Sequence, residues 1–154
     1  MSYVKHVIQP GEQVVMVGRL SWIVYHRAIA LALLGVILVV LERIYSGRDW
    51  LVIGTAALFG AAALISALQA WFLRWTTEIA VTNKRIIYKR GLITRHTAEM
   101  NMDKVASVDV DQSLLGRLLN YGSVHILGTG GVHGIERLER IGSPIALRNA
   151  IDVR

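Results

Sequence analysis

Two long apolar runs interrupt the alternation of hydrophobic and polar positions along the chain. The first is continuous from Ala28 to Leu41 and, with its apolar flanks, covers residues 22–45. The second, residues 50–73, contains no charged residue and has tryptophans near its ends, where indoles favour a membrane interface. Helices of this length cross the ~30 Å hydrocarbon core of a bilayer. We therefore predict two membrane spans.

A short connection joins the two runs. Residues 42–49 link them and Gly47 marks a turn, so the runs are predicted to form an antiparallel hairpin over 22–73. Arg43 and Arg48 lie in this connection, whereas Lys and Arg residues are more numerous on the other side of the hairpin. The positive-inside rule then places both termini in the cytoplasm.

After the hairpin the hydrophobic period changes to two, which is typical of strands. The sequence of residues 74–154 predicts a mainly-β domain that ends in a helix starting at Ser143-Pro144. Residues 114–119 break the alternation and are predicted to form a short helical turn or loop, closed by 120–122. The predicted strands are 77–82, 85–90, 93–102, 105–111, a strand containing Val124 and Ile126, and one from about 134 to 141.

The segment before the hairpin also has strand character. Residues 12–20 alternate, with Val15 and Val17 on one face and Val14 and Met16 on the other. A strand of this length does not fold alone. Our hypothesis is that residues 1–21 add a strand to the C-terminal sheet, so that the hairpin is inserted into one domain.

Composition narrows the partners of this chain. It is 53% hydrophobic and 18% charged, with a net charge of +6 and a pI of about 10.1, a balance that suits an anionic surface such as lipid or nucleic acid. Nucleic-acid binding usually adds exposed aromatic residues, but only Tyr88 and Tyr121 supply Phe or Tyr after residue 76, so we expect no nucleic-acid partner. The absence of cysteine excludes disulfides, thiolate catalysis and cysteine-ligated metal.

Several segments in order along the chain are similar to one family. They are Pro10-Gly11-Glu12, Ser21-Trp22, TNKRIIYKRGL at 82–92, MDKVASV at 102–108 and QSLLGRLLNYG at 112–122. Together they resemble the bacterial pleckstrin-homology-like (PH-like) membrane proteins. The resemblance implies a split barrel of two sheets capped by the C-terminal helix, in the bacterial inner membrane. It does not assign a biochemical activity, because most members of the family have none assigned. The chain lacks the Lys/Arg-x-Arg triplet of lipid-binding eukaryotic PH domains, so specific phosphoinositide recognition is not expected.

Two surfaces are candidates for binding. A basic group follows the second span closely enough to meet anionic headgroups, although a solvated strand face that enforces topology explains the same charges. Its members are Lys84, Arg85, Lys89, Arg90 and Arg95, with His96 beside them. The second candidate is an apolar interaction surface formed by Leu114, Leu115, Leu118 and Leu119, together with exposed strand edges.

Other motifs carry little chemistry. Gly128-Thr129-Gly130-Gly131 lacks the Gly-Lys-Ser/Thr of a phosphate loop and is predicted to be a hairpin turn. His125 and His133 flank that turn, but two histidines alone make a poor metal site. The aspartates Asp103, Asp109 and Asp111 have no nucleophile or histidine near them in sequence. We expect no catalytic residue, metal or cofactor.

The sequence therefore favours a non-enzymatic, membrane-anchored interaction or scaffold module at the cytoplasmic leaflet. Its expected partners are membrane lipids and either further copies of itself or another membrane protein. The alternatives are a sensor of anionic lipids and an accessory subunit of a transport or export complex. Salt distinguishes the interaction or scaffold module from the lipid sensor, since headgroup contact weakens as ionic strength rises and an apolar interface does not.

Overall fold

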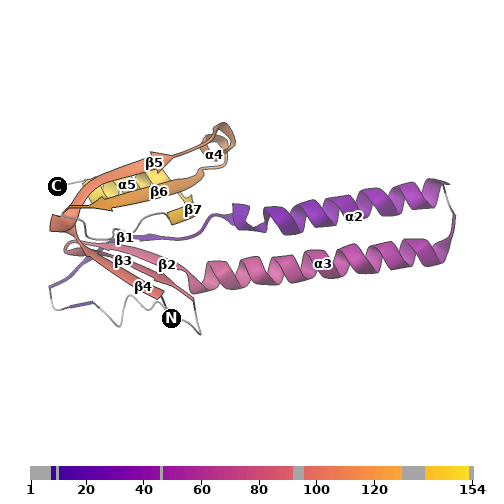
Figure 1. Cartoon of the computed structure of the whole chain (residues 1–154), viewed down its shortest axis with the longest axis horizontal. Helices are drawn as coiled ribbons and strands as arrows, with labels where there is room; N and C mark the ends of the chain where they lie inside the picture. Colours follow the sequence, from indigo (N-terminus) through magenta and orange to yellow (C-terminus); the bar gives the residue numbers. More distant parts are fainter. Residues whose placement is uncertain (1–7, 10, 46, 92–95, 130–137, 153–154) are drawn as a thin grey trace. The chain divides into compact units, whose positions relative to one another are not determined.

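The computed structural model describes residues 8–9, 11–45, 47–91, 96–129 and 138–152 (Figure 1). Two compact units emerge from the contacts within the chain. One combines residues 1–22 with 73–154, and the other comprises residues 23–72. We call them the β unit and the hairpin unit.

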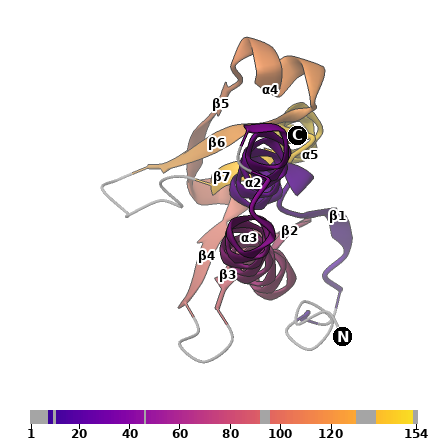
Figure 2. The ribbon, with the colours of Figure 1, turned by 90° about the vertical axis from the view of Figure 1, so that its right-hand side faces the viewer.

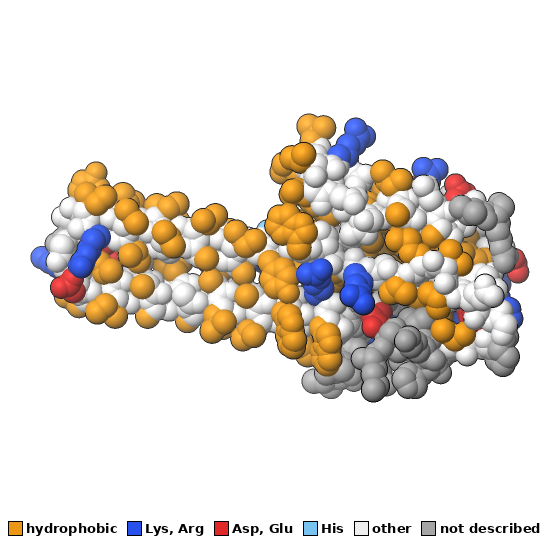
Figure 3. Space-filling model, turned by 180° about the vertical axis from the view of Figure 1, so that it is seen from behind, with side chains coloured by type: hydrophobic (Ala, Val, Ile, Leu, Met, Phe, Trp, Pro, Cys, Tyr) orange, Lys and Arg blue, Asp and Glu red, His pale blue; other side chains and the backbone are white. Residues whose placement is uncertain are grey.

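The hairpin unit is built from two helices that are long and apolar enough to cross a membrane. A 3₁₀ turn, η1 (Trp22–Tyr25), leads into α2 (His26–Tyr45), and α3 (Asp49–Thr76) returns. Hydrophobic side chains cover their visible face (Figure 3). In the most apolar window of each helix only 17% and 6% of the residues are buried, so neither helix resembles the core helix of a soluble protein.

Close contacts hold α2 against α3. Gly35 is so near Phe59 that an added Cβ would lie 2.6 Å from the Phe59 Cβ. The Thr55 hydroxyl donates a hydrogen bond of 2.8 Å to Glu42 Oε1. Near the connection, Arg43 forms an ion pair with Asp49. A small residue therefore allows close packing while polar pairs fix the helices near their connection.

The first sheet of the β unit has four antiparallel strands in the order β1-β2-β3-β4. Its strands are β1 (Val14–Gly18), β2 (Glu78–Thr82), β3 (Arg85–Arg90) and β4 (His96–Asn101). Val17 of β1 pairs with Ala80 of β2, so the strand before the hairpin lies beside the strand after it. Ala80 and Ile87 on the outer face are buried under Ile8, which explains why this sheet does not alternate strictly between buried and exposed residues.

The second sheet has the order β5-β6-β7 (Figure 2). A 3₁₀ turn, η2 (Met102–Lys104), leads from β4 into β5 (Val105–Asp111), and the short helix α4 (Leu114–Leu118) connects β5 to β6 (Tyr121–Gly128). The last strand is β7 (Leu138–Gly142). A bridge between Leu20 and Ile141 joins the chain just after β1 to this sheet, as expected of a barrel that closes at one corner.

The C-terminal helix α5 (Pro144–Asp152) packs against strands of both sheets. Its Leu147 is fully buried, and Ile151 lies one turn further along the same face. The predicted class, a two-span helical hairpin with a mainly-β split barrel and a C-terminal helix, is confirmed. The core side chains are Ile79, Val81, Ile86, Met100, Val124, Ile126, Leu138, Ile141, Leu147 and Ile151.

Some boundaries differ from those predicted. β6 begins at Tyr121, so two residues expected to close the preceding turn belong to a strand. They extend the ladder because Tyr121 pairs with Gly142 of β7. α3 continues past Leu73 to Thr76. The starts predicted for the third and last strands, residues 93–95 and 134–137, lie outside the described residues.

Candidate functional site

Arg85, predicted to contact headgroups, is held in a buried ion pair with Glu12. The Glu12 side chain is 0% exposed and that of Arg85 13%. The guanidinium donates from Nε to Glu12 Oε1 at 3.0 Å and from Nη2 to Oε2 at 3.1 Å, a bidentate geometry. Its Nη1 donates to Glu99 Oε2 at 2.8 Å. Two carboxylates therefore neutralise Arg85, and we leave it out of any headgroup surface.

The surroundings of Glu12 favour its ionised form. The hydrogen bond from Arg85 lowers the pKa of the Glu12 carboxyl from 4.5 to about 2, and burial opposes this only in part. The backbone N–H of Gln9 donates to Oε2 at 2.9 Å, and the Thr82 hydroxyl to Oε1 at 2.7 Å. The same pair raises the pKa of Arg85. The cluster fastens the N-terminal segment to β2 and β3.

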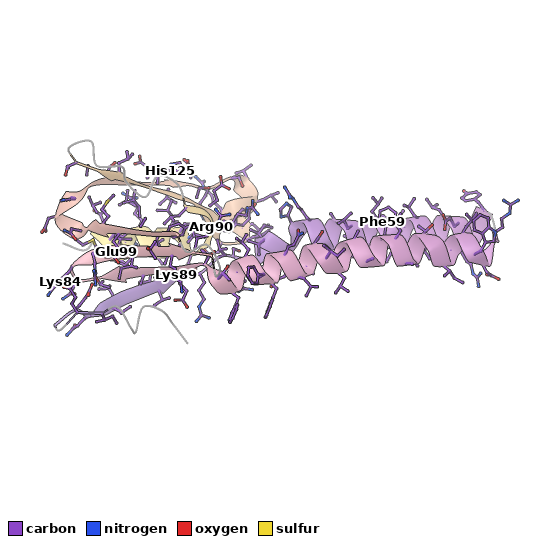
Figure 4. All side chains as sticks on the ribbon, turned by 60° about the horizontal axis from the view of Figure 1, so that its bottom comes forward. Phe59, Lys84, Lys89, Arg90, Glu99 and His125 are labelled. Atoms are coloured by element: carbon purple, nitrogen blue, oxygen red, sulfur yellow. The ribbon has the colours of Figure 1, made fainter. Side chains whose placement is uncertain are left out.

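The other predicted basic residues lie apart from one another, before β3 and at its far end (Figure 4). Lys84 is exposed in the turn before the strand, whereas Lys89 and Arg90 are at its far end, about 16 Å away at the usual rise of a strand. Because successive side chains alternate, Lys89 and Arg90 point to opposite faces. Arg95 and the side chain of His96 lie outside the described residues. The structure therefore does not gather Lys84, Lys89 and Arg90 on one surface.

The predicted leucine surface is exposed on α4. The exposed fractions of Leu114, Leu115 and Leu118 are 85%, 64% and 79%. We call these three residues the leucine tip. Leu119, predicted with them, is half-buried and lines a pocket of the β unit.

Hydrogen bonds hold the leucine tip in a fixed shape. The Ser113 side chain caps α4 by accepting from the Gly116 N–H at 3.0 Å. Gln112 Nε2 donates to the Tyr121 carbonyl at 3.1 Å. Gly116 is buried so closely that an added Cβ would lie 2.7 Å from the Tyr121 carbonyl oxygen. These contacts support the leucines. The sequence did not predict this role for Gln112, Ser113 and Gly116.

A strand edge forms the second exposed feature of this sheet. In the described part of the chain β5 pairs only with β6, and we call its other edge, which no described strand covers, the open edge. Beside it runs a groove of about 270 Å³, and the half-buried Val105 and Val108 supply apolar side chains to it. We call it the β5 groove; Met102, Asp103, Ala106, Ser107, Ile151 and Asp152 complete its lining.

A histidine and two aspartates lie close together on the outer face of the second sheet. His125 stands opposite Asp109 in the ladder, and its Nε2 lies 3.4 Å from Asp111 Oδ2. The sequence did not predict this proximity, because the histidine and the aspartates come from different strands. No group of three or more His, Cys, Asp or Glu residues suited to a metal ion occurs among the described residues, and His133 lies outside them.

A comparison with known proteins agrees with this architecture. The family model described as "Bacterial PH domain" matches residues 17–153, which covers the hairpin and the β unit from residue 17 onward, except its last residue. Neither the curated proteins nor the solved structures gave a significant match.

Proposed function

Because this chain belongs to the bacterial PH domain family, we propose that it is a membrane-anchored, non-enzymatic interaction module that assembles with copies of itself through β5. The family suggests a module that binds lipids or proteins. The proposal of self-assembly rests on the open edge of β5. An exposed edge strand can accept an added strand, in which main-chain hydrogen bonds supply affinity and pockets select side chains.

The hairpin unit supports anchoring in the bacterial inner membrane with both termini in the cytoplasm. Both helices are apolar over a spanning length and mostly unburied. Their short connection puts both ends of the hairpin on one side, and Arg19, Arg27 and Arg74 flank it there. Anchoring would confine copies to one plane, which raises their effective concentration.

The sequence of β5 suits pairing with a second β5. In an antiparallel pair centred on Val108, Asp109 of each copy faces Ser107 of the other, and Asp111 faces Val105. Carboxylates are then never directly opposed, which avoids the destabilisation caused by like charges. Val108 and Val110 share one face of the strand and are half-buried valines that can extend the apolar interior.

The chain contains no cysteine, so single thiols can test this assembly. We would compare Ser107→Cys with Ser123→Cys, which faces the same side from the central strand β6, in the full chain in membranes. In the proposed pair the two Ser107 positions are about 7–8 Å apart, whereas the two Ser123 positions are more than ~14 Å apart. A short bifunctional thiol reagent should link dimers only at position 107. Equal or absent linkage at 107 would refute assembly through β5.

Sensing of anionic lipids by the basic residues of β3 receives less support. Arg85 is neutralised by Glu12 and Glu99. Lys84 is far along the strand from Lys89 and Arg90.

A further inference from the structure

We infer that the leucine tip inserts into the interface of the membrane that holds the protein's own hairpin, and so gives the β unit a third membrane contact. The occupant is the boundary between lipid headgroups and acyl chains. This inference rests on the membrane anchoring proposed above and is independent of assembly through β5.

The side chains of the tip have the composition of an interfacial anchor. Residues 112–122 contain three strongly exposed leucines and no acidic residue; their only charge is Arg117, which is exposed between Leu115 and Leu118. Leucine side chains enter the acyl boundary, while an arginine between them reaches the headgroups with its long stem. A soluble surface rarely exposes neighbouring large apolar side chains without a binding role.

The position of the tip within the β unit selects the membrane as occupant. One pocket of the β unit is lined by Leu119 and Asn120, next to α4, and by Trp22 and Arg74, where the chain leaves for the two helices. Hydrogen bonds fasten these segments together: Gly142 N–H donates to the Arg19 carbonyl at 3.0 Å, and Ser143 N–H to the Asn120 carbonyl at 3.0 Å. The tip therefore lies at the end of the β unit from which both spans depart.

Interfacial residues at this end strengthen the inference. Trp22 and Trp75 are 47% and 60% exposed, and both lie within a few residues of the helix ends. Indoles beside spans settle at the headgroup level. A hairpin that spans the membrane therefore keeps this end of the β unit near the interface, where the leucine tip can reach it.

The test places an environment-sensitive fluorophore on Leu115→Cys in the full chain, with one chain per nanodisc of zwitterionic and anionic phospholipid. Leu127→Cys is the matched control, because Leu127 is also exposed, at 49%, but lies at the opposite end of β6 from α4. Lipids carrying a nitroxide near the head of the acyl chain should quench the probe at position 115 at least about twofold more than at 127.

Three results would overturn the inference. They are equal quenching at the two positions, no quenching at 115, and shielding of the probe at 115 from water without quenching by nitroxide lipid. The last result would indicate a protein partner or a second copy. Failure of the proposed membrane anchoring is detected by a separate experiment. An unanchored chain would be released when the membranes are extracted with alkaline carbonate. Failure of β5 assembly appears only in the cross-linking experiment.

Discussion

Replacing Glu12 with glutamine should destabilise the β unit and flatten its dependence on pH. Glu12→Gln keeps the shape of the side chain but removes the charge that Arg85 faces at 3.0 Å. Arg85 would keep Glu99 at 2.8 Å as a partner, but the Glu99 side chain is 39% exposed and compensates only in part. Removing one member of a buried pair leaves the other charge poorly compensated.

The size of the effect follows from the pKa of Glu12. Lowering it from 4.5 to about 2 corresponds to roughly 3 kcal/mol, at about 1.4 kcal/mol for each tenfold change. Because the folded pKa is the lower one, this stabilisation is complete above pH 4.5 and is lost as the pH falls towards about 2. We expect Glu12→Gln to lose about 2–3 kcal/mol at neutral pH.

Hydrogen–deuterium exchange of the β2 and β3 amides, in the full chain in nanodiscs, measures this loss as an opening free energy. The matched control is Glu139→Gln on β7, because the Glu139 side chain is 52% exposed and its carboxylate lies 4.0 Å from Arg140. The gap between wild type and Glu12→Gln should close as the pH falls from 4.5 towards 2. Equal opening free energies at neutral pH, or parallel pH curves, would refute a stabilising role for the pair.

Three further substitutions test other contacts. Gly35→Leu should lower the melting temperature of the helices in detergent, because the new Cβ would lie 2.6 Å from the Cβ of Phe59. The control Gly54→Leu should not lower it, because a Cβ at position 54 meets nothing within 4 Å. Equal melting temperatures of the two variants would contradict this packing. Ser113→Ala should cost about 1 kcal/mol locally and speed amide exchange in α4, whose cap it removes. Gly122→Ala should destabilise the β unit in urea, since its Cβ would lie 2.7 Å from the Asp111 carbonyl oxygen; an unchanged midpoint would show that the strands shift at little cost.

The sequence predicted elements well where the signal is local. Both long apolar helices follow from uncharged runs, and β2 and β3 follow from alternation around Asn83-Lys84. Contacts between distant segments left no local signal. Glu12 is separated from Arg85 by 73 positions, so the basic residues looked like one free cluster although one of them is buried in an ion pair.

The leucine surface illustrates the same limit. An apolar segment could be recognised at 114–119, but its sequence did not separate the exposed Leu114, Leu115 and Leu118 from the half-buried Leu119. That distinction depends on the strand start at Tyr121 and on the packing of Gly116 against its carbonyl. The open edge of β5 likewise depends on strand order, which alternation does not encode.

The pairing of β1 with β2 has a consequence for biogenesis. These strands are neighbours in the sheet, yet the chain between them is the entire hairpin. For a hairpin that spans the membrane, β1 leaves the ribosome first and waits for its partner until both helices have been inserted. A chain with one helix inserted would hold β1 and β2 on opposite sides of the bilayer, with both edges unpaired and open to proteases. For such a hairpin, the ladder between β1 and β2 would form only after both helices have been inserted.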